Sequence, residues 1–116
     1  YKLPKTTEEE KMQRSKAIQA GFKQAALVPL GVADNSLEIL DLSDTVATQG
    51  NPNAVTDGAV GAMLARTAGL AALYNVKINL TAIKDKEFVD NTAKQADRLE
   101  VQLIEKEKQV LARVKL

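Results

Sequence analysis

Apolar residues recur along most of the chain at intervals of three and four positions, which is the period of an α-helix. The strict alternation of apolar and polar residues that is typical of a β-strand is absent from the sequence. The first helix is predicted to begin after Thr6 and Thr7, because Thr7 and Glu10 have the spacing of a capping box at a helix start. The periodic pattern continues to about Val28, so the first predicted helix ends there.

A proline separates the first predicted helix from the second. Pro29 has no backbone N–H to donate, and we therefore expect the helix to kink or break at this residue. The second helix is predicted over residues 30–48, with Gly50 as its C-terminal cap and the loop 51–53 after it.

The third predicted helix covers residues 58–80 and is apolar on nearly all sides, which is typical of a helix that is buried on most sides. Thr56 is a good N-cap for it, and Asp57 favours its first turn. One stripe carries only small residues, which let another helix approach closely: Gly58, Gly61, Ala62, Ala65, Ala68, Gly69 and Ala72. Because Arg66 lies in the middle of this apolar run, we expect a core helix and not a membrane span.

The fourth predicted helix begins near Asp85 and runs to the C-terminus. Its apolar side consists of Phe88, Val89, Ala93, Ala96, Leu99, Leu103, Val110 and Val114. The connections between the segments are short, and the sequence contains no internal repeat and no Ser/Gly linker. The sequence therefore predicts one all-α domain over residues 1–116, a long-helix antiparallel bundle of about four helices.

The composition excludes several kinds of chemistry. The sequence has no histidine and no cysteine, which excludes a Ser-His-Asp triad, a thiolate zinc site and a cysteine nucleophile. No metal-binding motif is visible, so we expect no metal cofactor. With 16 basic and 15 acidic residues the net charge is +1, and we expect neither a nucleic-acid partner nor a membrane. No charged-then-apolar signal segment is visible, so we expect a cytoplasmic protein.

Two groups of polar residues remain as candidates for chemistry. The first is the segment 50–57, which contains Asn51, Asn53, Thr56 and Asp57. These are the residue types of a helix stop, a turn and a helix start, so the segment has a purely structural explanation. They also suit a ligand site, because a helix N-terminus offers free N–H groups to an anion.

The second group consists of Asn75 and Asn79, which are four residues apart and share one helix face. They extend the stripe of small residues beyond Ala72. A buried amide needs hydrogen-bond partners, since leaving it unsatisfied costs about 1–3 kcal/mol. Those partners are either groups on a neighbouring helix or a polar, planar ligand, and the sequence leaves both possibilities open.

Five short stretches carry a resemblance to a known family. They are Tyr1-Lys2-Leu3-Pro4-Lys5, Val28-Pro29-Leu30, Gly50-Asn51-Pro52-Asn53 with Thr56-Asp57, Asn75-Val76-Lys77-Ile78-Asn79-Leu80, and Ile83-Lys84-Asp85. In order and spacing they resemble the C-terminal half of the formiminotetrahydrofolate cyclodeaminase family, which includes proteins described as methenyltetrahydrofolate cyclohydrolases. The Gly-rich, Ser-containing helix with which family members start has no counterpart here, so we expect the chain to be the C-terminal part of a larger helical domain.

The resemblance implies an all-helical enzyme of one-carbon folate metabolism that forms a homodimer or a higher homo-oligomer and binds a reduced folate. A cyclodeaminase closes N5-formiminotetrahydrofolate to 5,10-methenyltetrahydrofolate and releases ammonia, a step of histidine degradation. A cyclohydrolase acts on the same methenyl compound. The family's chemistry requires no metal, and positioned acids and bases accelerate such proton transfers by about 10²–10⁴-fold.

On the matched positions, the resemblance assigns roles to individual residues. Asp57 is expected to be the catalytic acid–base or the carboxylate that anchors the pteridine. Polar contacts with the folate are expected from Asn51, Asn53, Thr56, Asn75 and Asn79, and contacts with its glutamate tail from Lys77 or Lys84. A non-catalytic alternative remains open, in which the chain is a helical dimerisation module or binds folate without turnover.

Overall fold

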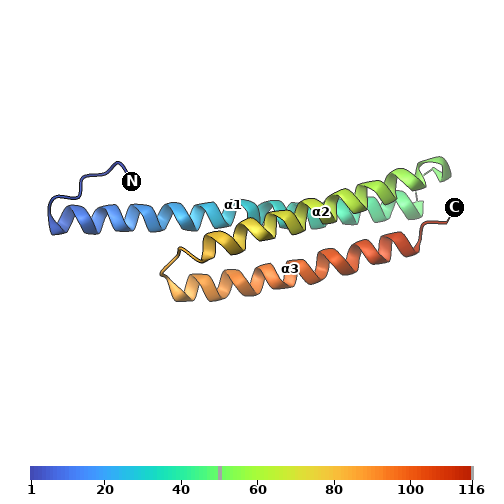
Figure 1. The fold of residues 1–116 in the computed structure, drawn as a ribbon. Coiled ribbons are helices and arrows are strands. Elements are labelled where there is room, and N and C mark those ends of the chain that lie inside the picture. The colour runs from blue at the N-terminus through green and yellow to red at the C-terminus, as the bar shows by residue number, and fades with distance from the viewer. Residues whose placement is uncertain (50, 116) are drawn as a thin grey trace.

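The structure, a computed structural model, describes residues 1–49 and 51–115. Helix α1 covers Glu8–Gln49, the short 3-10 helix η1 covers Pro52–Ala54, α2 covers Val55–Leu80 and α3 covers Lys86–Ala112. No strand occurs among these residues, and the all-α prediction is confirmed. The chain runs along α1, returns along α2 and turns again into α3, in an elongated shape of 67 × 24 × 16 Å (Figure 1).

The first two predicted helices are one continuous helix, so the break expected at Pro29 and the count of about four helices are wrong. α1 has 42 residues, and Pro29 lies inside it. The helix continues because the residues on both sides of the proline belong to the same core: Ala26 and Leu30 are both buried there. Packing of one helical face on both sides of a proline outweighs the single backbone hydrogen bond that the proline removes.

The capping box predicted for the first helix is confirmed. The hydroxyl oxygen of Thr7 accepts a hydrogen bond from the N–H of Glu10 at 3.1 Å, and the Glu10 carboxylate accepts from the N–H of Thr6 at 3.0 Å. The Glu10 carboxylate also accepts from the hydroxyl of Thr6 and from the N–H of Thr7. The hydrogen bonds to this carboxylate lower the pKa of the Glu10 carboxyl, first the one from the Thr6 hydroxyl and then those from the backbone N–H groups. Glu10 therefore stabilises the start of α1 in its ionised form.

The start of the predicted third helix differs from the expectation. Ala54 occupies the N-cap position of α2 and makes no side-chain capping bond, so the prediction of Thr56 as the N-cap is wrong. The reason is η1, which opens at Pro52 and leads straight into α2, so that Thr56 already lies inside the helix. Gly50, the predicted C-terminal cap of the preceding helix, lies outside the described residues.

The start of the last helix follows the sequence more closely than its end does. Asp85 is the N-cap of α3, and its carboxylate accepts from the N–H of Phe88 at 3.2 Å. The helix ends at Ala112 and so leaves Val114 outside it. The predicted apolar side faces the core, since Ala96, Leu99, Leu103 and Val110 are all buried.

Small residues bring the three helices close together. A Cβ atom added to Gly69 of α2 would lie 2.6 Å from Cδ1 of Leu103 on α3 and 3.1 Å from Cβ of Ser36 on α1. A Cβ atom added to Gly58 would lie 3.3 Å from the backbone nitrogen of Ala47 on α1. The predicted close approach along the stripe of small residues is confirmed, and the contacts offset the helix propensity of about 1 kcal/mol that each glycine forgoes.

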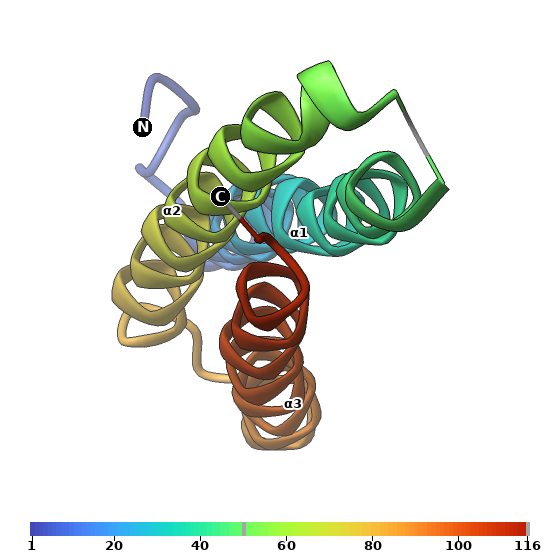
Figure 2. The same cartoon turned by 90° about the vertical axis from the view of Figure 1, so that its right-hand side faces the viewer.

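α2 is covered on one side only, and the expectation that it is buried on most sides is wrong for the single chain. Its outer side exposes 51% of Val60, 65% of Leu64, 76% of Tyr74 and 65% of Ile78. The reason is that α3 packs on one side of the α1–α2 pair, whereas no helix of the described residues covers the outer side of α2 (Figure 2). By length and composition alone the stretch Pro52–Leu80 would also suffice to cross a membrane, a test that a core helix passes equally.

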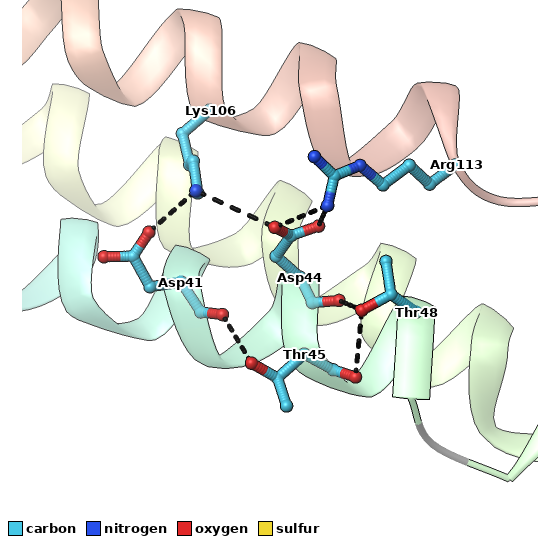
Figure 3. Close-up of polar contacts among 6 residues, drawn as sticks. All are labelled: Asp41, Asp44, Thr45, Thr48, Lys106 and Arg113. Atoms are coloured by element: carbon cyan, nitrogen blue, oxygen red, sulfur yellow. Dashed lines mark hydrogen bonds and ion pairs between the residues drawn. The ribbon is translucent and has the colours of Figure 1, made fainter.

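Ion pairs join the C-terminal ends of α1 and α3 (Figure 3). Nη1 of Arg113 lies 2.7 and 2.8 Å from the two carboxylate oxygens of Asp44, whose side chain is only 15% exposed. Nζ of Lys106 lies 3.0 Å from Asp41 and 3.8 Å from Asp44. These acidic residues of α1 therefore hold α3 in place and are occupied by protein partners.

Candidate functional site

Two adjoining hollows, of about 350 and 500 Å³, lie along the contact of α1 with α2. Both are lined by Ala25 and Asn79, so they form one continuous groove, here called the α1–α2 groove. Its apolar lining includes Ala17, Ile18, Gly21, Phe22, Val28, Pro29, Val32, Ala68, Ala71 and Ala72. Many of these side chains are small, and together with the amides of Asn75 and Asn79 they make a surface that suits a planar, polar ligand.

Asn79 is held by the protein itself. Its Nδ2 donates to the backbone carbonyl of Asn75 at 2.8 Å and to that of Ala25 on α1 at 3.2 Å. The second bond crosses between helices, so the structure supplies the interhelical partner that the sequence left open. The side chain still lines both hollows and is half-buried.

Asn75 is the more accessible of the two amides. It is exposed, lies one helical turn from Asn79 and lines the larger hollow. Within residues 1–49 and 51–115, the structure gives its side-chain amide no hydrogen-bond partner. Asn75 therefore keeps both a donor and an acceptor for a bound molecule.

The segment before α2 forms a compact turn. Oδ1 of Asn51 accepts from the N–H of Asn53 at 2.9 Å, and the carbonyl of Asn51 accepts from the N–H of Ala54 at 2.8 Å. Thr56 and Asp57 follow in the first turn of α2, and both are exposed. The structural explanation of Asn51 and Asn53 thus holds, while Asp57 remains available to a ligand.

The two candidate groups lie at opposite ends of α2. Asp57 and Asn79 are 22 positions apart on one helix, and at a rise of 1.5 Å per residue this places them about 33 Å apart along its axis. The fold of one chain therefore brings Asn75 and Asn79 together but leaves Asp57, Asn51, Asn53 and Thr56 at a distance.

The two candidate lysines have different surroundings. Lys77 faces α3, where its Nζ lies 3.3 Å from Glu100 and 3.8 Å from Asp97. Lys84 follows the end of α2 and is exposed, and its backbone N–H donates to Oε1 of Gln19 on α1 at 2.8 Å. Lys84 is therefore the lysine that lies near the Asn79 end of the groove with its side chain in solvent.

Sequence reasoning missed the α1 side of the groove. Tyr1 lines the smaller hollow, and Arg14 lies over its ring with 5.5 Å from the guanidinium carbon to the ring centre. Pro29 and Ala25 line the larger hollow because α1 continues through the proline. The available signal was the Val28-Pro29-Leu30 stretch, which contributed to the family resemblance and predicted a kink or break but was not assigned to a site.

Electrostatics near the groove are modest. Lys23 of α1 contacts Asp85 at 2.7 Å, and this hydrogen-bonded ammonium, followed by the N–H of Phe88, lowers the pKa of the Asp85 carboxyl. Among the described residues no three histidine, cysteine or acidic side chains gather in a way that would hold a metal ion. The chemistry of the groove is that of amides and apolar surface.

Comparison with known proteins decides the family. Residues 1–98 match the formiminotransferase-cyclodeaminase family. The chain belongs to this family. The resemblance inferred from the five stretches is thereby confirmed, and it covers α1, α2 and the first half of α3.

Relatives of the chain within this family carry two different names. The chain is 39% identical over 100 residues to a protein named methenyltetrahydrofolate cyclohydrolase from Methylorubrum extorquens, which covers 85% of the chain. It is 36% identical over 91 residues to formimidoyltransferase-cyclodeaminase of Rattus norvegicus and 37% over 98 residues to that of Gallus gallus, covering 78% and 84% of the chain. The chain spans 48% of the length of the first and 17% and 18% of the other two.

Proposed function

We propose that this protein binds a reduced folate in the α1–α2 groove and acts in cytoplasmic one-carbon metabolism as a cyclodeaminase. The observation that carries the proposal is the pairing of an apolar groove rich in alanine with the free amide of Asn75 in a member of this family. The planar pyrimidine ring of a reduced pterin suits such a surface on its faces and amides at its edge. No metal takes part in the proposed reaction.

A specific observation also favours a second activity. The relative with 39% identity is named a methenyltetrahydrofolate cyclohydrolase. Both reactions involve the methenyl folate, so the same groove would serve either.

Ring closure by a cyclodeaminase needs N10 held against the amidine carbon, a base for the proton of N10 and an acid for the departing nitrogen. Orientation and acid–base catalysis supply these requirements.

A homodimer would bring the separated candidates together. The exposed residues Val60, Leu64, Thr67, Ala71, Tyr74 and Ile78 follow one another at alternating intervals of four and three, which is the heptad spacing of a helix that packs against another helix. We call this set the α2 outer seam. We propose that it pairs with the outer seam of a second copy.

The outer seam is symmetric, which favours an antiparallel pair. Val60 and Ile78 are equally far from position 69, as are Leu64 and Tyr74. An antiparallel pairing about this centre sets Asp57 of one copy level with position 81 of the other, about 3 Å along the axis from Asn79. In this arrangement Asp57 serves the groove of the other copy.

The enzyme activities are tested with the intact protein. We expect it to release ammonia from 5-formiminotetrahydrofolate, or to hydrolyse the methenyl folate, and Asp57→Asn to lower kcat by about 100-fold. Asp90→Asn, which changes an exposed acid on α3, is the matched control and should retain full turnover. If Asp57→Asn turns over at the unchanged rate, the acid–base role is wrong. If neither compound binds, the chain is a helical module without this activity.

The dimer is tested by mass measurement in solution. Leu64→Asp places a charge in the centre of the outer seam and should convert a dimer into a monomer. Val101→Asp changes a side chain of similar exposure, 62%, on α3 and should leave the dimer intact. A monomeric unsubstituted protein, or a dimer that survives Leu64→Asp, contradicts the proposed pairing.

A further inference from the structure

Pro29 and Asn79 meet at one atom, the carbonyl oxygen of Ala25. In an uninterrupted α-helix this oxygen would accept from the N–H of residue 29, and a proline has no N–H to give. Instead, Nδ2 of Asn79 donates to it at 3.2 Å from the neighbouring helix. The backbone acceptor that the proline leaves unpaired, the carbonyl of Ala25, is therefore satisfied by a side chain 54 positions further along the chain.

The orientation of the Asn79 amide follows from this contact. Its two hydrogens point to two carbonyl oxygens, those of Ala25 at 3.2 Å and Asn75 at 2.8 Å. Turning the amide over would place Oδ1 against both oxygens, and two acceptors repel each other. Asn79 thus spends its donors inside the protein and offers the groove only an acceptor, Oδ1.

We propose that Asn79 supplies the hydrogen bond that Pro29 removes and is thereby a positioning residue of the α1–α2 groove. Ala25, Pro29, Asn75 and Asn79 all line the larger hollow. The bond fixes the α1 wall against the α2 wall at the place where α1 has lost one of its own backbone bonds. The use of this groove for folate rests on the proposed function. The replacement of the Pro29 hydrogen bond by the Asn79–Ala25 hydrogen bond, here called the Pro29–Asn79 joint, does not.

A double-mutant cycle in the full chain tests whether the Asn79–Ala25 hydrogen bond replaces the one that Pro29 removes. Asn79→Ala should raise the unfolding equilibrium constant by about fivefold, because it removes a hydrogen bond to the Ala25 carbonyl that is worth about 1 kcal/mol. In a Pro29→Ala background the restored N–H of residue 29 takes that carbonyl, and Asn79→Ala should change the constant less than about threefold. Asn75→Ala is the matched control and should stay below about threefold in both backgrounds. An equal loss on Asn79→Ala in both backgrounds overturns the proposal.

A spectroscopic measurement reads the joint directly. In the unsubstituted protein, the side-chain NH₂ protons of Asn79 should exchange with solvent at least about tenfold more slowly than those of exposed Asn75. Pro29→Ala should narrow this difference, since the backbone then competes for the same carbonyl. Equal exchange rates for the two amides contradict the joint. Neither measurement uses a folate, so failure of the joint and failure of the proposed function are distinguishable.

Discussion

Gly69 is the position of α2 with the least room for a side chain. An added Cβ atom would lie 2.6 and 3.0 Å from the two methyl carbons of Leu103 and 3.1 Å from Cβ of Ser36. Leu103 is fully buried, so any shift of its methyl groups has to take place within the packed core. Because the added methyl would press on α3 and α1 at once, we predict that Gly69→Ala destabilises the fold.

The size of the effect follows from two opposing contributions. Overpacking a core costs about 1–3 kcal/mol, and a contact well below van der Waals distance on two helices places this case near the upper end. Alanine returns about 1 kcal/mol of helix propensity relative to glycine. The expected net loss for Gly69→Ala is about 2 kcal/mol, or about 8 °C in Tm for a chain of this size.

Gly31→Ala is the matched control on α1. A Cβ atom added there meets nothing within 4 Å, so only the helix propensity changes and the variant should gain about 1 kcal/mol. Urea unfolding followed by circular dichroism at one protein concentration measures both. The double variant Gly69→Ala/Leu103→Val, with a shorter side chain facing residue 69, should recover part of the loss. If Gly69→Ala is as stable as Gly31→Ala, the close approach of the helices is not what the glycine serves.

Three further predictions concern caps and charges. Thr7→Ala should speed amide exchange of Glu10 by about fivefold, since a lost N-cap costs about 1 kcal/mol, and Thr7→Ser should not. Arg113→Ala should lower the free energy of unfolding by about 0.5–1 kcal/mol at low salt. The loss should be smaller in 1 M NaCl, where charges are screened within about 3 Å, and an equal loss at both salt concentrations contradicts an ionic role. The pKa of Asp85 lies below its ordinary 3.8 because Lys23 and a backbone N–H favour the carboxylate. Its contribution to stability is therefore present above pH 3.8 and lost as the pH falls through the lowered pKa. The stability difference between the protein and Asp85→Asn should shrink in that acid range, and a difference independent of pH refutes the assignment.

Local signals in the sequence were enough to predict that the chain is helical and to place several of the helix ends. The period of three and four gave helical segments everywhere, and Thr7, Glu10 and Asp85 cap their helices through bonds between near neighbours. The stripe of small residues indicated close packing because glycine in a helix needs a compensating contact, and Gly69 has one. Such inferences succeed because each depends on residues within a few positions or on one helix face.

Expectations that depended on distant residues were less successful. Pro29 was expected to end a helix, since nothing near it shows that Asn79 pairs with the carbonyl it frees. Thr56 was expected to cap α2, but η1 leads into that helix earlier. The same holds for the candidate site. The family resemblance assigned both Asp57 and Asn79 to the folate, but both lie on the one helix α2, which separates them by about 33 Å within one chain.

The all-round apolar character of α2 is best understood as two faces with different partners. The face with Gly58, Gly69 and their small neighbours packs inside the chain, where there is no room for a larger side chain. The opposite face carries large side chains that the chain leaves exposed, Leu64 and Tyr74 among them. Changes on the two faces should therefore separate in experiment: Gly69→Ala lowers the stability of the fold at any protein concentration, whereas Leu64→Asp changes association and its dependence on concentration. If Leu64→Asp instead lowers the stability of the fold at any protein concentration, as Gly69→Ala does, the two faces are not independent. The outer seam then belongs to the core of the chain.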